Sequence, residues 1–174
     1  MNNKKIKILS IILAVLFAAT VIDDIGKLFN SNGVQIITTI VDLLAALFGI
    51  FYVLVGCTKK NGARFFTVFM ILQALIYFLL ILFSRPLPEW HGVMMMLVKF
   101  VCLCLLAFAK DLGKKKSYII ALIYVAMGVF SMCVRLDSLS FIYIATRIEN
   151  LLFSVSTLLM VAAKYVDKDE RGTK

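Results

Sequence analysis

The chain has 174 residues, 62% of them hydrophobic, and a formal net charge of +9. Soluble domains are only about half apolar, so this composition excludes an ordinary soluble fold. The net charge would suggest nucleic-acid binding in a soluble protein, but the basic residues form no compact basic module, so we expect no nucleic-acid partner.

Long apolar runs predict an all-α, polytopic integral membrane protein. The six predicted transmembrane helices are at about 6–28, 34–57, 65–83, 93–109, 117–134 and 141–163, and a charged tail follows at 164–174. Short connections make neighbouring helices antiparallel, which predicts three hairpins in a single domain, 1–174. The first run follows a basic start and also fits a signal peptide; the absence of a small-x-small cleavage site before the Asp pair favours an uncleaved helix.

The basic residues are distributed unevenly between the two sets of predicted loops. Most of the 19 Lys and Arg residues lie at the chain ends and in the segments 58–64 and 110–116, whereas Lys27, Arg85 and Arg135 lie on the opposite side. This is the positive-inside pattern, which predicts that both termini are cytoplasmic. We therefore expect a bacterial-type plasma (inner) membrane as the location, with the lipid bilayer as the first partner.

Polar and small residues form stripes along several of the predicted helices. The stripe in 34–57 comprises Gln35, Thr38, Asp42, Ala45, Gly49, Tyr52 and Gly56. The stripes in the last two helices comprise Ser117, Ala121, Tyr124, Gly128, Ser131 and Arg135, and Tyr143, Arg147, Asn150, Ser154 and Thr157. Steps of three and four place each stripe on one helix face, so each helix has a protein side and a lipid side.

Charged side chains within these spans form the candidate ligand-binding site. It comprises Asp24, Asp42, Lys99, Arg147, Glu149 and Asn150, with Asp23 beside Asp24. Asp42, Lys99 and Arg147 each stand at the same spacing from a basic residue at the cytoplasmic end of their helix, so we expect them at one depth, in the outer half of the membrane. Charges are costly there and should converge.

Three interpretations of this cluster remain open. The first is an outward-facing polar cavity, with Lys99 and Arg147 holding an anionic group of the solute and Asp42 or Glu149 holding a cationic group or a proton. The second is structural ion pairing, Asp42 with Lys99 and Glu149 with a basic neighbour. The third is that the Asp pair only reaches interfacial water. The first interpretation predicts a cavity lined by Asp42, Lys99 and Arg147.

No other residues indicate a catalytic, metal or cofactor site. Cys57, Cys102, Cys104 and Cys133 have the spacing of neither a disulfide framework nor a zinc site and are interpreted as packing residues. His91 is the single histidine, and Met94 to Met96 fan around a helix. We expect no cofactor and no enzyme; a membrane aspartyl protease on Asp24 and Asp42 is the remaining enzymatic alternative.

Ser10, Ala14 and Ala18 form a ridge of small residues along the first predicted helix. With the chain length, the six spans and the cytoplasmic ends, this ridge resembles the substrate-binding membrane subunits of energy-coupling-factor vitamin transporters. In that family an Ala-x-x-x-Ala on the first helix docks the transmembrane coupling subunit, and Ala14 and Ala18 have that spacing. The resemblance implies a partner membrane subunit along this ridge.

Together these patterns predict a transport or substrate-binding subunit for a small polar or zwitterionic solute. The alternative is a non-transporting accessory, immunity or assembly membrane protein whose interior charges only hold helices together.

Overall fold

Six helices make up the chain in its computed structural model, which describes residues 3–30, 34–56, 62–83, 90–109, 112–133 and 141–171. The helices are α1 (Asn3–Asn30), α2 (Val34–Gly56), α3 (Gly62–Phe83), α4 (Trp90–Phe108), α5 (Lys114–Cys133) and α6 (Phe141–Arg171). No strand occurs in these ranges, so the all-α prediction is confirmed for the described residues.

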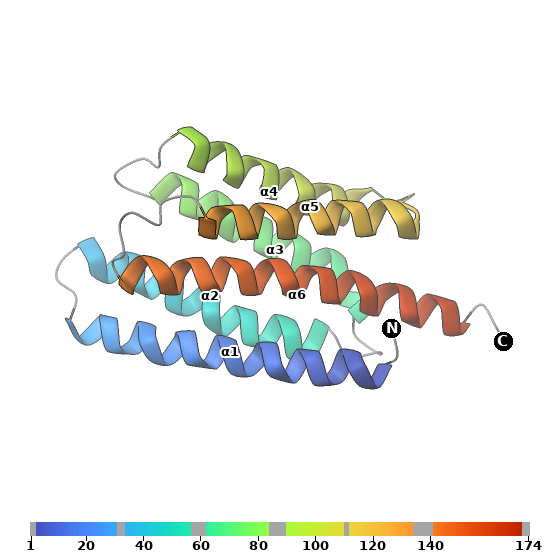
Figure 1. Cartoon of the computed structure of the whole chain (residues 1–174), viewed down its shortest axis with the longest axis horizontal. Helices are drawn as coiled ribbons and strands as arrows, with labels where there is room; N and C mark the ends of the chain where they lie inside the picture. Colours follow the sequence, from blue (N-terminus) through green and yellow to red (C-terminus); the bar gives the residue numbers. More distant parts are fainter. Residues whose placement is uncertain are drawn as a thin grey trace.

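The six helices run roughly along one axis as a bundle, with the first turn of α1 and the last turn of α6 at the same end (Figure 1). The closest packing joins α1 with α2, α3 with α4, and α5 with α6, which are the three predicted hairpins. Helix α6 also packs against α1, α2 and α3, while α4 packs against α5. Helix α6 is therefore the central element, and it brings the interior faces of the other helices together.

Several helices are longer than their apolar cores. Helix α6 continues to Arg171, past the predicted end at about 163, through the first part of the predicted charged tail. The sequence from Lys164 to Arg171 has neither Gly nor Pro and is rich in Lys, Glu and Arg, which favour helix. Hydropathy marks the apolar part of a helix, whereas the backbone helix ends where helix-breaking residues begin.

Small residues on the predicted stripes lie inside the bundle. Gly49 is so close to α1 that a Cβ there would overlap the ring of Phe17. A Cβ at Gly128 would lie 2.6 Å from Ser154 Oγ, and one at Gly56 would lie 2.5 Å from Met160 Cε. These three glycines thus allow close contact between α1 and α2, α5 and α6, and α2 and α6, so these members of the predicted stripes lie in the interior.

The small-residue ridge of α1 also contributes to the interior. Ser10 and Ala14 are buried within the chain, and Ala18 is half-buried. Ser10 donates a hydrogen bond to the Lys7 carbonyl within the same helix. The ridge therefore packs inside this bundle, and the docking of a partner subunit along it stays a prediction.

Large apolar side chains cover the outside of the bundle. On α1 alone Ile8, Ile11, Val15, Ile22 and Phe29 are exposed, and every other helix also exposes large hydrophobic residues. Two segments of the described residues, Lys4–Asn30 and Ile148–Tyr165, are long and apolar enough to cross a membrane. Shorter apolar stretches occur at Asp42–Gly56, Phe65–Leu75 and Val93–Phe108.

Replacement of Gly49 by Ala tests the close contact between α1 and α2. Phe17 is fully buried and packs edge-to-face on Phe153, with ring centroids 5.0 Å apart, so its ring has little room to move. We expect Gly49→Ala to destabilise the protein by about 1–3 kcal/mol, the usual cost of overpacking. Thermal unfolding in detergent measures it.

Gly26→Ala is the matched control on α1, because no atom lies within 4 Å of a Cβ at that position. Equal stability of the Gly49→Ala and Gly26→Ala proteins would contradict the close approach of the two helices.

Candidate functional site

A chain of buried hydrogen bonds links four helices in the middle of the bundle. Thr157 on α6 donates its hydroxyl hydrogen to Gln73 Oε1 on α3, at 3.1 Å, and shares it with the Phe153 carbonyl of its own helix, at 2.9 Å. Since that hydrogen is engaged, Tyr52 on α2 donates to Thr157 Oγ1, at 3.2 Å. Gln73 Nε2 in turn donates to the Tyr124 hydroxyl on α5, at 2.9 Å. The four side chains satisfy one another away from water.

Lys99 on α4 extends this network toward α6. Its side chain is buried, its ammonium donates to Asn150 Oδ1 at 3.4 Å, and the same nitrogen lies 5.7 Å from the centroid of the Tyr124 ring. Two members of the predicted site, Lys99 and Asn150, are thus in contact. The carbonyl dipole of Asn150 and the face of the Tyr124 ring both stabilise a cation in a poorly hydrated interior.

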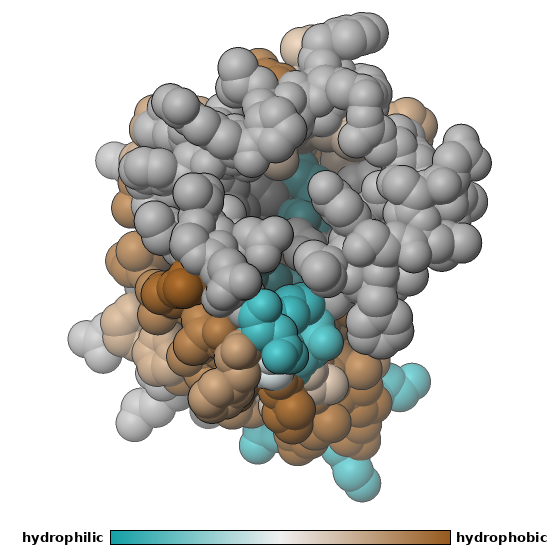
Figure 2. Space-filling view, turned by 90° about the vertical axis from the view of Figure 1, so that its left-hand side faces the viewer, coloured by the Kyte–Doolittle hydropathy of each residue, from teal (hydrophilic) through white to brown (hydrophobic). Residues whose placement is uncertain are grey.

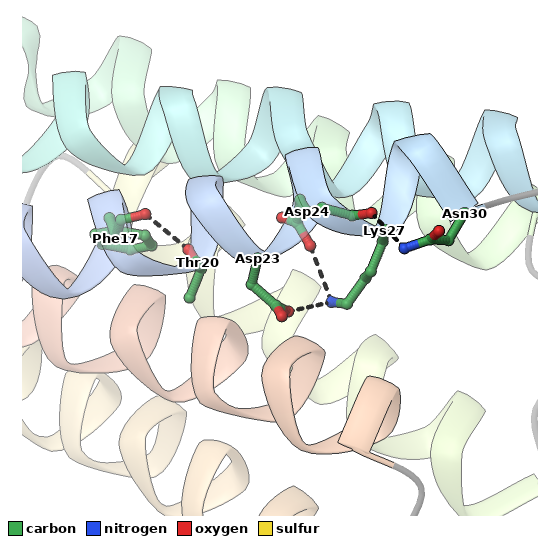
Figure 3. A network of polar contacts seen from close by, with 7 residues as sticks. Phe17, Thr20, Asp23, Asp24, Lys27 and Asn30 are labelled. Atoms are coloured by element: carbon green, nitrogen blue, oxygen red, sulfur yellow. Dashed lines mark hydrogen bonds and ion pairs between the residues drawn. The ribbon is translucent and has the colours of Figure 1, made fainter.

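Three acidic and basic side chains of α1 form a compact group near the end of that helix, shown in Figure 3. Lys27 Nζ lies 2.6 Å from Asp23 Oδ2 and 3.0 Å from Asp24 Oδ1. The spacings of three and four residues place all three on one helix face. Asp24 is buried, whereas Asp23 keeps about a third of its side chain exposed, at 32%.

Asp42 on α2 and Glu149 on α6 complete an acidic cluster with Asp24. The charges of Asp24 and Lys27 act on both Asp42 and Glu149, and Asp42 and Glu149 act on each other, so the four groups lie within electrostatic range. Glu149 is buried and Asp42 is half-buried. The three helices that carry these carboxylates, α1, α2 and α6, pack against one another.

The predicted ion pair of Asp42 with Lys99 is not formed. The ion pairs that the described residues show here join Lys27 to Asp23 and Asp24, and Lys99 is engaged by Asn150. Glu149 Oε1 and Asp24 Oδ2 are buried and accept no hydrogen bond from the described part of the chain. The side chain of Arg147, the remaining predicted member of the site, lies outside the described residues.

The polar side chains gather toward the end of the bundle opposite the termini. Figure 2 looks at that end and shows hydrophilic residues near its centre, with further hydrophilic surface recessed behind them, surrounded by hydrophobic residues lower on the face. Hydrophilic and hydrophobic residues thus share this end of the bundle.

A cavity of about 280 Å³ lies elsewhere, between α3 and α4. Its walls are almost entirely apolar; they include Met70, Ala74, Phe78, Phe100 and Cys104. Neither Asp42 nor Lys99 lines this groove. The predicted outward-facing cavity at the charged cluster stays a prediction. An apolar groove on an apolar outer surface suits an acyl chain or another helix better than a polar solute.

The cysteine, histidine and methionine residues considered from the sequence form no metal site among the described residues. Among the described residues, no group of three or more His, Cys, Asp and Glu side chains is placed to hold a metal ion. Cys102 is buried, Cys104 is half-buried and Met94 is exposed. The side chains of His91, Cys57 and Cys133 lie outside the described residues.

Two features of the site were missed by the sequence analysis. Lys27 was counted with the outer basic residues and left out of the candidate site, although its spacing from Asp23 and Asp24 is that of helical ion pairs. The bonds among Tyr52, Gln73, Tyr124 and Thr157 had no such signal, because these residues lie on different helices.

Comparison with protein-family models, with curated proteins and with solved structures gives no match for this chain. The interpretation of the site therefore rests on its own residues and geometry.

The buried network predicts a specific role for Thr157. Thr157→Val keeps the side-chain shape but leaves Gln73 Oε1 and the Tyr52 hydroxyl without this partner, so we expect a loss of about 1–2 kcal/mol in the free energy of unfolding. Chemical unfolding in mixed micelles measures the difference.

Ser156→Ala provides the comparison on the same helix. Ser156 is fully buried, but its hydroxyl bonds the Leu152 carbonyl of its own helix. If the two variants lose the same stability, the hydrogen bonds between helices contribute nothing beyond a local hydroxyl.

Proposed function

We propose that this protein is a six-span integral membrane protein, with both termini in the cytoplasm, that binds a small polar solute inside the outer half of its bundle. One observation carries the proposal: Asp24, Lys99 and Glu149 are buried, while large aliphatic and aromatic side chains are exposed. This distribution is the reverse of that of a water-soluble protein, in which buried charges are rare and large exposed apolar patches mark a contact surface. A lipid environment accounts for the outside, and a polar ligand site accounts for the inside.

The position of the charges supports binding over a purely structural role. A buried pair that only held helices together would satisfy its own oxygens, because an unsatisfied charged group in a low-dielectric interior costs several kcal/mol. Asp42 lacks the predicted pairing with Lys99, and two buried carboxylate oxygens have no donor among the described residues.

A non-transporting accessory protein is the second candidate function. It is favoured by the closed network of Tyr52, Gln73, Tyr124 and Thr157, which leaves the middle of the bundle filled, and by the apolar groove between α3 and α4. In that case the groove would contact a partner helix in the membrane.

The proposed topology predicts the behaviour of reporter fusions. We expect a green fluorescent protein fused after residue 174 to fluoresce, because the C-terminus is cytoplasmic. Alkaline phosphatase inserted between α1 and α2 or between α5 and α6 should be active, because these connections carry few basic residues and face outward. Alkaline phosphatase inserted between α2 and α3 is the control and should be inactive. If it is active there and inactive at the other two positions, the protein has the opposite orientation to the proposed one.

Solute binding predicts stabilisation of the purified protein by ligand. We expect at least one compound in a panel of amino acids, betaines, sugars and small amines to raise the unfolding temperature in detergent by roughly 5–10 °C at a hundred times its dissociation constant. The Asp42→Asn protein should need at least ten times more ligand for the same rise in unfolding temperature. The Ser156→Ala protein should need the same ligand concentration as the parent protein. The accessory function would be favoured by two results together: no compound of the panel stabilises the parent protein, and crosslinking from the groove recovers a partner membrane protein.

A further inference from the structure

Asp24, Asp42 and Glu149 bring three carboxylates from three helices into one region of the bundle. Helices α1, α2 and α6 pack against one another, so the cluster belongs to the core arrangement rather than to a surface loop. Lys27 is the described cation whose charge acts on all three of these groups. Among the described residues, the cluster therefore holds more carboxyl groups than cations, in a part of the protein where water is scarce.

Lys27 satisfies only part of this cluster. Its ammonium is held by Asp23 Oδ2 and by Asp24 Oδ1, both on its own helix. Asp24 Oδ2 and Glu149 Oε1 remain without a donor among the described residues, although Asp24 is 97% buried and Glu149 is 95% buried, since their exposed fractions are 3% and 5%. Two nine-tenths-buried acceptors thus lie in the cluster in addition to the half-buried carboxylate of Asp42.

Lys99 is engaged in a different part of the interior. Its nitrogen contacts Asn150 Oδ1 and the Tyr124 ring, on the α4 and α5 side of α6. The polar interior is thus divided into a satisfied part around Lys99, Tyr124 and Gln73, and an acidic part with vacant acceptors around Glu149 and Asp24.

The chemistry of the vacant acceptors favours a nitrogen cation over a metal ion. Metal coordination needs several oxygens at about 2.0–2.6 Å from one point, and the described residues form no group close enough for that. An ammonium or amidinium group carries several N–H donors on a larger frame and can reach carboxylates from different helices at about 2.7–2.9 Å. Lys27, whose ammonium bridges Asp23 and Asp24, shows this recognition within the chain itself.

We propose that the solute carries a positively charged amine or amidine, which donates hydrogen bonds to Glu149 and Asp24 while Asp42 adds negative charge from α2. The inference rests on the proposed solute binding and names the class of ligand for that site. Glu149 is the central acceptor because α6 carries it into the interface with both α1 and α2.

The test compares probes that differ in charge but little in size. The full-length protein in detergent at pH 7.5 and constant ionic strength is titrated with ethanolamine, putrescine, choline and agmatine, with ethylene glycol as the neutral probe and glycolate as the anionic probe. The readout is the dissociation constant from thermal shift and from calorimetry. We expect at least one cationic probe to bind at least tenfold more tightly than ethylene glycol and at least tenfold more tightly than glycolate.

Variants of the cluster identify the binding group. Glu149→Gln should weaken binding of the cationic probe at least tenfold. Glu149→Asp should retain part of the affinity because it keeps the carboxylate. If Glu149→Gln does not fold, Asp24→Asn on α1 replaces it, and it should also weaken binding of the cationic probe. Ser156→Ala, buried on α6 away from the cluster, should bind like the parent protein.

The outcomes separate this inference from the proposed function. If the neutral or anionic probe, or a solute of the wider panel without a cation, binds and Glu149→Gln leaves its affinity unchanged, the cationic ligand is rejected while solute binding stands. If no compound of any charge binds the parent protein, both are rejected.

Discussion

The need to satisfy polar side chains away from water organises this bundle around α6. Thr157 at the middle of that helix bonds Gln73 of α3 and accepts from Tyr52 of α2, and Gln73 passes the connection to Tyr124 of α5. Because large apolar side chains lie on the outside of the bundle as well as inside it, hydrogen bonds and close packing must specify which helix faces meet. Helix α6 supplies both, and it contacts α1, α2, α3 and α5.

Small residues provide the space that this arrangement needs. Gly49, Gly56 and Gly128 bring backbones together at three helix contacts, and each lies where a larger residue would meet Phe17, Met160 or Ser154. Aromatic rings fill the adjoining layer, with Phe17 packed on Phe153 and Tyr52 packed on Phe69. The middle of the bundle is thus closely packed.

The contrast between the two parts of the interior is the basis for interpreting function. Around Tyr124 and Gln73 each donor has an acceptor, which is the expected state of a structural polar core. Around Glu149 and Asp24 buried oxygens lack donors among the described residues, and the nearby ammonium of Lys27 bonds Asp24 through its other oxygen. Such an imbalance in a buried site is costly and is typical of a place where a ligand supplies the missing charge.

Much of the helix arrangement could be predicted from the chain alone. Periodicity placed Ala45, Tyr52 and Tyr124 on interior faces, and all three are buried. The candidate site was predicted in part: Asp24, Asp42 and Glu149 do lie together, but Lys99 belongs with Asn150 and Tyr124 instead of with Asp42. Depth along a helix can be estimated from residue spacing, whereas the helix that a given face meets cannot.

The sequence by itself determined the helical fold, the interior faces of α2, α5 and α6, and the presence of charged groups within apolar segments, because these depend on local spacing along one helix. Only the tertiary structure decided that α6 is central, that Thr157 connects to Gln73 and Tyr52, and that Lys99 contacts Asn150 and the Tyr124 ring. Those features depend on how the helices are rotated and arranged around one another, and contacts between residues far apart in the chain leave no periodic signal in it.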